Sequence, residues 1–286
     1  FGKYGQVGYE LLRAMAPLGP VVAIDYPEVD LANPDSIREW IRRTAPAVVV
    51  NAAAYTTVDK AETEPELAMA INGNAPRIMA EEAARLGALM VHYSTDYVFD
   101  GTKNGPYTEL DTPNPLSVYG HTKLAGERGV REAGGSHLIF RLCWVYGARG
   151  RNFMLTIMRL AREREQLRVV SDQIGSPTWS RMVAEATALV LAQARFSGAG
   201  RALSGLYHLS AAGQVSWHGF AEAIVSRMDP AVRKCRQVEA IPASEYPLPA
   251  KRPAWSVFSC EKLKQTFGLS LPKWDESLDA VLDQSK

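Results

Sequence analysis

The sequence predicts an α/β protein of the Rossmann type, in which a doubly wound parallel sheet is followed by a smaller, mixed C-terminal region. From residue 6 to about residue 170, apolar runs alternate with longer helical segments, as in parallel strands joined by crossover helices. The runs are apolar throughout, which is typical of strands covered by helices on both faces. A glycine-rich turn leads into the first helical segment, as in dinucleotide-binding sheets.

The elements are predicted in chain order from this alternation. Asn33 and Pro34 mark one helix start, because Asn is a good N-cap and Pro is tolerated in the first turn. Strands are expected at 21–24, 47–51, 88–93 and 138–142, and helices at 6–15, 34–44, 64–86, 117–132 and 152–165. Beyond about residue 170 proline and glycine interrupt the rhythm. We therefore expect a dinucleotide-binding domain over 1–148, to which later strands return, and a mainly substrate-binding region over 149–286.

The composition is that of an ordinary globular chain, since 47% apolar residues among 286 can supply a full core. Lys and Arg number 32 against 31 Asp and Glu, so no basic field is available to hold nucleic acid or an anionic membrane. The apolar runs are too short to cross a bilayer, and a cytoplasmic location is expected. The three cysteines, Cys143, Cys235 and Cys260, lack CxxC spacing, which argues against a disulfide framework and a zinc site.

The chain opens "FGKYGQVGYELL", and Gly2, Gly5 and Gly8 form a GxxGxxG turn before a helix. Such glycines permit a tight turn and close approach of a pyrophosphate to the helix N-terminus, at Gln6 and Val7. A plain helix-capping loop is the alternative. Such a turn normally follows a strand, so we expect that the first strand of the sheet lies outside this sequence.

Two acidic residues follow the first helix at the positions of an adenosine site. The run Val-Val-Ala-Ile ends at Asp25, near the spacing at which a carboxylate binds the adenosine ribose and favours NAD over NADP. Asp30 and Leu31 are candidates for the adenine edge. An ordinary strand-end Asp and a turn-capping Asp are the alternatives. The small residues of "NAAAYTT" let backbone pass close to a cofactor, or pack helix against sheet.

The strongest local pattern is Tyr119-Gly120-His121-Thr122-Lys123 within a predicted helix. Residues four apart share a helical face, so the phenol and the ammonium can point into one cleft. A nearby cation lowers the pKa of a tyrosine from its usual value of about 10, which makes the pair a candidate acid–base unit. The stretch "STDYVFDG", which begins at Ser94, ends a predicted strand and adds the hydroxyl of Thr95.

Together these motifs resemble the extended short-chain dehydrogenase/reductases, in which a Ser or Thr, a Tyr and a Lys form the catalytic set. The resemblance assigns that set to Thr95, Tyr119 and Lys123. Within that superfamily, "NAAAYTTVDKAE", "HYSTDYVFDG", "PLSVYGHTKLAGE", "FRLCWVYG" and "GLYHLSA" are similar to the dTDP-4-dehydrorhamnose reductase family. The resemblance implies that NADPH or NADH reduces the C4 ketone of dTDP-4-dehydro-L-rhamnose to give dTDP-L-rhamnose.

The family resemblance also implies the residues that line the site. Trp144 is one of them, although it could instead belong to the core with Phe140 and Tyr146. The sugar pocket is expected to include Val58, Thr95, Asp96, Tyr97 and Trp144. The cofactor contacts are expected to be Gly2, Gly5, Gln6, Val7, Asp25, Asp30, Leu31, Ala54, Tyr55, Thr56, Tyr93, Tyr119 and Lys123.

The sequence departs from the family pattern at a magnesium site that some members build from three glutamates. Glu10 fits the first position, but Arg181 stands at the second and Asp275 at the third, so no metal is expected here. Asp25 would repel a 2′-phosphate, and the choice between NADPH and NADH stays open. Arg252 either meets the diphosphate of the dTDP-sugar or is an ordinary strand-edge arginine. The oligomeric state is open, with a homodimer as one option.

Two other functions fit parts of the pattern. One is a nucleotide-sugar dehydratase or epimerase of the same superfamily. Related dehydratases carry Glu directly after the Asp of the strand-end motif, where this chain has Tyr97, so the elimination machinery is lacking. The other is a non-catalytic NADP-binding protein similar to the regulatory subunit of methionine adenosyltransferase. The presence of Thr95, Tyr119 and Lys123 favours an enzyme.

Overall fold

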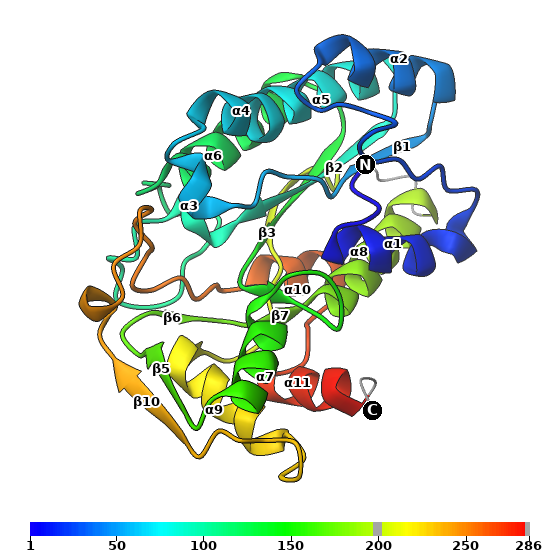
Figure 1. The fold of residues 1–286 in the computed structure, drawn as a ribbon. Coiled ribbons are helices and arrows are strands. Elements are labelled where there is room, and N and C mark those ends of the chain that lie inside the picture. Colours follow the sequence, from blue (N-terminus) through cyan, green and yellow to red (C-terminus); the bar gives the residue numbers. More distant parts are fainter. Residues whose placement is uncertain (197–201, 284–286) are drawn as a thin grey trace.

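The computed structural model describes residues 1–196 and 202–283. Figure 1 shows two parts, a parallel sheet with helices on both sides and a smaller part in which α7, α9 and α11 lie together. The predicted fold class is confirmed. The core of the smaller part includes Tyr146 as well as residues after 148, so the domain division at residue 148 stays a prediction.

The central sheet has the strand order β1-β2-β3-β8, and every neighbouring pair is parallel. The two central strands, β2 and β3, are almost entirely buried, as the apolar runs predict. All four carboxyl ends therefore lie at one edge, where open parallel sheets bind ligands. The strands are β1 (Val48–Asn51), β2 (Leu89–Thr95), β3 (His137–Leu142) and β8 (Gly205–His208).

Two groups of helices cover the sheet (Figure 1). On one side Ile37 and Ile41 pack with Ile78 and Met79, and on the other Leu11 packs with Val183 and its neighbours. The first group is α2 (Pro34–Thr44), α5 (Ala75–Leu86) and α6 (Val118–Glu132), and the second is α1 (Gln6–Met15) and α8 (Ser180–Phe196). Since β8 and α8 follow residue 148, later segments do return to the sheet, as expected.

Side-chain caps set the starts of several helices. The Asn33 side chain accepts hydrogen bonds from the Asp35 and Ser36 amides, and Pro34 occupies the first helical position. Ser117 accepts from the Gly120 amide at the start of α6. The predicted helix 64–86 is interrupted, because a π-helical turn, η2 (Ala70–Asn74), separates α4 (Pro65–Met69) from α5.

The smaller part has its own core, in which Met154, Ile157, Phe220 and Leu278 are buried together. Its two-stranded parallel sheet pairs β5 with β10. Its elements are α7 (Phe153–Glu163), β5 (Gln166–Val170), α9 (Trp217–Arg227), β10 (Gln237–Ile241) and α11 (Trp274–Asp283).

Short elements connect these layers. They are η1 (Ala16–Leu18), α3 (Val58–Ala61), η3 (Asp96–Val98), β4 (Val145–Tyr146), β6 (Ile174–Gly175), β7 (Thr178–Trp179), β9 (Val215–Ser216), η4 (Ala243–Glu245) and α10 (Glu261–Phe267). None of the described helices is long and apolar enough to span a membrane.

The strand expected at 21–24 is wrong, because this segment does not pair as a strand of the sheet. The Gly2 amide donates a backbone hydrogen bond to the Ile24 carbonyl. Val21 and Val22 are exposed rather than buried. Between this segment and β1 lies an apolar cavity of about 780 Å³, which none of the expected catalytic residues lines.

Candidate active site

The glycine turn forms a cradle at the N-terminus of α1. Gly2 has a left-handed φ of 88°, and a Cβ there would lie 2.6 Å from the Ala53 amide nitrogen. A Cβ on Gly8 would lie 1.8 Å from the Gly2 carbonyl oxygen. Side chains are therefore excluded where the turn approaches the loop after β1, and the free amides of the first helical turn favour an anion. These features fit the pyrophosphate of a dinucleotide.

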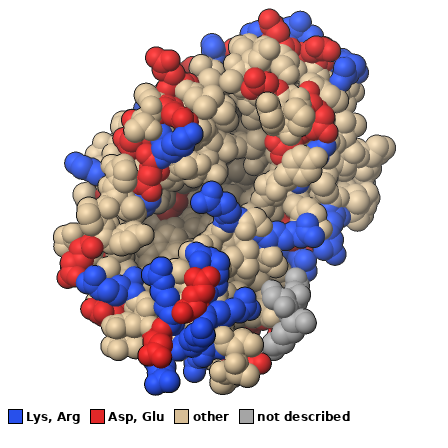
Figure 2. Space-filling view, viewed as in Figure 1, with Lys and Arg blue, Asp and Glu red and all other residues tan. Residues whose placement is uncertain are grey.

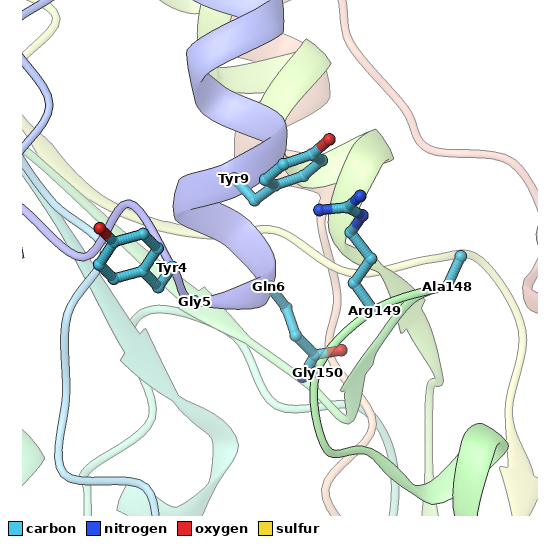
Figure 3. A pocket seen from close by; sticks show the side chains of 7 residues that line it. All are labelled: Tyr4, Gly5, Gln6, Tyr9, Ala148, Arg149 and Gly150. Atoms are coloured by element: carbon cyan, nitrogen blue, oxygen red, sulfur yellow. The ribbon is translucent and has the colours of Figure 1, made fainter.

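A pocket of about 470 Å³ opens beside this turn and is closed on its other side by residues 148–150. In Figure 3 the Arg149 guanidinium faces the Tyr9 ring, and the two lie 4.0 Å apart. The Gln6 side chain points toward the same loop (Figure 3), where its amide oxygen accepts a hydrogen bond from Asn152 at 2.9 Å. Arg149 thus adds a positive charge to the pocket that the helix N-terminus already makes favourable for anions.

Asp25 lies beside the turn, as expected, but its oxygens already accept backbone hydrogen bonds. Oδ2 accepts from the Tyr4 amide at 3.0 Å and Oδ1 from the Tyr26 amide at 2.9 Å. Asp25 therefore fixes the loop that would surround the ribose. The Asp30 carboxylate accepts a hydrogen bond from the Ala32 amide, as expected of an aspartate that caps a turn. Leu31 packs against the core cluster that contains Ile37 and Ile41 of α2.

The loop after β1 is clamped by Asn72, which comes from the π-helical turn. Its side chain accepts a hydrogen bond from the Tyr55 amide at 2.8 Å and donates to the Tyr55 carbonyl at 3.0 Å. It also donates to Thr122 Oγ1 on α6 at 3.2 Å. The expected cofactor residues Ala54, Tyr55 and Thr56 are therefore held in place by a buried amide between two helices.

Thr95 ends β2 and is buried at the carboxyl edge of the sheet. Its hydroxyl donates to Asp96 Oδ1 at 3.1 Å and accepts from the Tyr97 amide at 3.2 Å. Behind it, the Cys143 thiol donates to Asp96 Oδ2 at 3.5 Å. Burial raises the pKa of Asp96 to about 6, against the opposing effect of its hydrogen bonds with Ser256, Thr95 and Cys143.

Tyr119 reaches the same edge from the first turn of α6. Its phenol lies near the Thr95 hydroxyl, and its ring meets the Tyr97 ring edge-on at 5.5 Å between centroids. Burial is the main cause that raises the pKa of Tyr119 to about 12, and the nearby Thr95 hydroxyl lowers it only in part. The structure brings together the two expected hydroxyls.

Lys123 lies one turn further along α6 and is buried. Its ammonium donates to the Tyr93 carbonyl oxygen at 2.5 Å, and burial lowers its pKa to about 8 despite the charge of Glu127. The expectation that the pKa of Tyr119 lies below its usual value is wrong for this structure, because burial raises it by more than the neighbouring groups lower it. Tyr93 holds the lysine through its backbone, while its phenol bonds Thr187 in the core.

Trp144 is half-buried and packs against the cluster that contains Cys143 and Phe258, whereas Phe140 and Tyr146 in the same stretch are fully buried. Its φ of 45° is left-handed. The indole stacks on Trp217 with 3.4 Å between ring centroids, and a Cβ on Gly175 would lie 2.4 Å from it. The backbone and the stacked ring thus fix the orientation of Trp144.

Arg252 is paired with the helix α3. Its guanidinium pairs with both oxygens of Asp59 at 3.1 and 2.9 Å and lies near the Tyr97 phenol. Val58, the neighbour of Asp59, is half-buried. Arg252 therefore lies near Tyr97 of the expected sugar pocket and is not part of a strand.

At the positions where some family members bind magnesium, the Arg181 guanidinium donates to the Glu10 carboxylate at 3.1 Å. Within the described residues, no cluster of three or more His, Cys, Asp and Glu side chains could hold a metal ion.

Several residues of this site were not predicted. Asn72 could have been noticed as a polar residue within an apolar helical run, and Arg149 as a cation after "VYG". Cys143 meets Asp96 only through the fold, because they are far apart in sequence. Figure 2 shows that the face between the two parts of the molecule is hollowed, and that Lys and Arg gather on the smaller part.

The Rossmann-type sheet, the glycine cradle and the grouping of Thr95, Tyr119 and Lys123 define an oxidoreductase of the short-chain dehydrogenase/reductase class. The family model described as the RmlD substrate binding domain matches residues 1–286. The chain belongs to this family, and several proteins similar to it are named dTDP-4-dehydrorhamnose reductase.

Individual relatives agree over nearly the whole chain. The dTDP-4-dehydrorhamnose reductase of Burkholderia thailandensis is 51% identical over 96% of this chain and 93% of that protein. The Escherichia coli K12 protein of the same name is 43% identical over 99% and 96%. A crystal structure of dTDP-4-dehydrorhamnose reductase from Bacillus anthracis in complex with NADP has a TM-score of 0.89 at 34% identity, covering 99% of this chain and 97% of that one.

Proposed function

We propose that this chain reduces the C4 ketone of dTDP-4-dehydro-L-rhamnose to the hydroxyl of dTDP-L-rhamnose, with NADPH or NADH as the reductant. The observation that carries the proposal is the meeting of two buried hydroxyls, those of Thr95 and Tyr119, at the carboxyl end of β2. Family membership supplies the substrate, since the related proteins are named for this sugar.

The reduced nicotinamide, when bound, supplies the hydride that attacks the ketone carbon. Tyr119 donates its proton to the oxygen on which negative charge develops. A pKa of about 12 keeps this phenol protonated at neutral pH, so the acid is ready before the reaction begins. Thr95 holds the phenol in place and presents its hydroxyl to the same oxygen.

Lys123 stabilises the phenolate that remains after the proton has left. Its ammonium is desolvated and held on the Tyr93 carbonyl, one helical turn from Tyr119. In this low-dielectric setting a developing negative charge nearby is stabilised more than it would be in water. We assign the nicotinamide ribose to Lys123 as well.

The remaining binding roles follow from the positions around this centre. The glycine cradle with Gln6, Val7 and Arg149 binds the pyrophosphate, and the loop with Ala54, Tyr55 and Thr56 borders the dinucleotide. Val58, Asp96, Tyr97 and Trp144 border the sugar. Tyr97 stands where related dehydratases carry Glu, and burial raises its pKa above that of a free tyrosine, so it cannot act as a carboxylate base.

Nicotinamide absorbance tests the proposal directly. We expect the purified protein to consume NADPH or NADH when dTDP-4-dehydro-L-rhamnose is added, and to consume less with other dTDP-keto-sugars. If the protein oxidises neither NADPH nor NADH with any of these sugars, the proposal is contradicted. If the protein binds a dinucleotide but never oxidises it, a non-catalytic binding role is favoured instead.

A further inference from the structure

An ion pair lies between the glycine turn and the segment that follows Ile24. Lys3 Nζ lies 2.5 Å from Glu28 Oε1, and the Lys3 side chain is only 18% exposed. The other carboxylate oxygen of Glu28 accepts a hydrogen bond from the Asp25 amide at 3.1 Å. Glu28 therefore binds both the lysine and the backbone of the residue at the ribose position.

The position of this pair follows from the backbone around it. The Gly2 amide donates to the Ile24 carbonyl at 2.9 Å, and the Tyr4 amide donates to the Asp25 carboxylate at 3.0 Å. The turn that cradles the pyrophosphate and the loop at the end of 21–24 thus meet on either side of Lys3. In dinucleotide-binding sheets the adenosine ribose lies between these two segments.

The charges at this place decide which ribose is accepted. NADP carries a phosphate on the 2′-oxygen, with a charge of about −1.5 to −2 at neutral pH, where NAD carries a hydroxyl. Asp25 and Glu28 would repel that phosphate, and Lys3 would attract it. Because Lys3 already pairs with Glu28, a phosphate has to displace Glu28 before it gains the lysine.

We propose that Glu28 is a specificity-determining residue: by holding Lys3 it withholds this cation from a 2′-phosphate and makes NADH the preferred dinucleotide. The inference rests on the proposed function, since it concerns the dinucleotide of that same site. A hydroxyl at the 2′-position leaves the Lys3–Glu28 pair intact, so NADH binds without this competition.

Binding of the two reduced dinucleotides, measured by nicotinamide fluorescence without any sugar, tests the proposal. We expect the unchanged protein to bind NADH more tightly than NADPH. Glu28→Gln should tighten NADPH binding by about tenfold and leave NADH within about twofold, because the amide no longer competes for Lys3. The gain should shrink at high salt, since it is electrostatic.

The double variant Lys3→Met/Glu28→Gln isolates the lysine. It should bind NADPH no more tightly than the unchanged protein does, while it still binds NADH. Glu163→Gln is the matched control, because it removes one carboxylate from an exposed i,i+4 pair on α7, far along the chain from the turn. Circular dichroism checks that each variant is folded.

The outcomes separate this inference from the proposed function. Tighter binding of NADPH than of NADH by the unchanged protein, an unaltered ratio in Glu28→Gln, or a gain that survives without Lys3 would each overturn the role of Glu28 alone. Failure of the unchanged protein to bind either dinucleotide would overturn both proposals.

Discussion

The catalytic end and the adenosine end of the site are built from different kinds of contact. At the catalytic end, Thr95 of β2 and Lys123 of α6 are buried, and burial shifts the pKa values of Tyr119 and Lys123. Around the glycine turn, Asp25 and Glu28 are accessible to solvent and are held by backbone amides and one ion pair. Buried groups interact strongly and control the chemistry, whereas solvent-accessible charges are screened and adjust selectivity.

The largest effect is expected from Tyr119→Phe, which removes the phenol that donates the proton. Turnover should fall by roughly 10²-fold or more, in the range for loss of a general acid. Dinucleotide binding should change little, because the ring and its contact with Tyr97 remain. The measurement is kcat from nicotinamide absorbance under saturating sugar.

Tyr246→Phe is the matched control, because it removes a phenol from an exposed ring. It should leave kcat unchanged. Near-normal turnover of Tyr119→Phe would remove the acid role and with it the contrast between the two ends.

The next effect is on stability and comes from Asp96. Its pKa is raised from 3.8 to about 6, so the folded state binds a proton more tightly than the unfolded state. The stability that this proton contributes is present below pH 3.8 and is lost as the pH rises through 6. Relative to Asp96→Asn, the unchanged protein should lose on the order of 3 kcal/mol of unfolding free energy between pH 4 and pH 7.

Urea unfolding of both proteins at the two pH values measures this difference. Asp100 and Asp111 have pKa values lowered from 3.8 to about 2, so their contributions begin to fall near pH 5, but both proteins share them and they cancel in the difference. An equal difference at both pH values would show that Asp96 is not desolvated in solution.

Asn72→Ala should have an intermediate effect. It leaves the Tyr55 amide and carbonyl without their side-chain partner, which should cost about 1–3 kcal/mol of unfolding free energy. The loop that borders the dinucleotide should loosen, so KM for the dinucleotide should rise more than kcat falls. Steady-state kinetics and urea unfolding measure the two effects.

Asn74→Ala supplies the control two residues further on, where the side chain is exposed. It should change neither quantity. If both variants behave alike, Asn72 does not position the loop, and the order of the dinucleotide end depends on the glycine turn alone.

Asn72 also shows which parts of this molecule its sequence could predict. The start of α2 was predicted because Asn33 caps the helix through residues only two or three positions away, and the expected start of the next helix at 117 lies one residue from that of α6. The hydroxyls at the end of β2 were predicted because strand ends meet at one edge. The clamp of Asn72 on Tyr55 depends on a π-helical turn, which local pattern does not encode.

Long-range contacts limited the prediction in the same way. The apolar run 21–24 has the composition of a strand, but pairing depends on its neighbours, and in the structure Val22 is exposed. The pKa of Tyr119 could not be judged from its spacing to Lys123, because the lysine bonds the Tyr93 carbonyl and burial dominates. The sequence pattern therefore predicts the layers of helix and sheet, whereas the burial that shifts the pKa values of the site residues depends on how these layers pack.

The smallest effect is expected at the rim, from Trp217→Leu. Trp217 stacks flat on Trp144 and also contacts the Phe153 ring at 4.5 Å between centroids. An aromatic pair contributes about 0.5–1.5 kcal/mol beyond burial, so KM for the sugar should rise roughly twofold to tenfold. Turnover at saturating sugar should stay constant, since Trp217 does not meet Thr95 or Tyr119 in the proposed chemistry. Trp217→Phe keeps a flat ring beside Trp144 and should recover much of the loss. If Trp217→Leu lowers kcat and leaves KM unchanged, the indole pair influences the buried catalytic end, and the division of labour between a buried chemical centre and an adjustable rim is wrong.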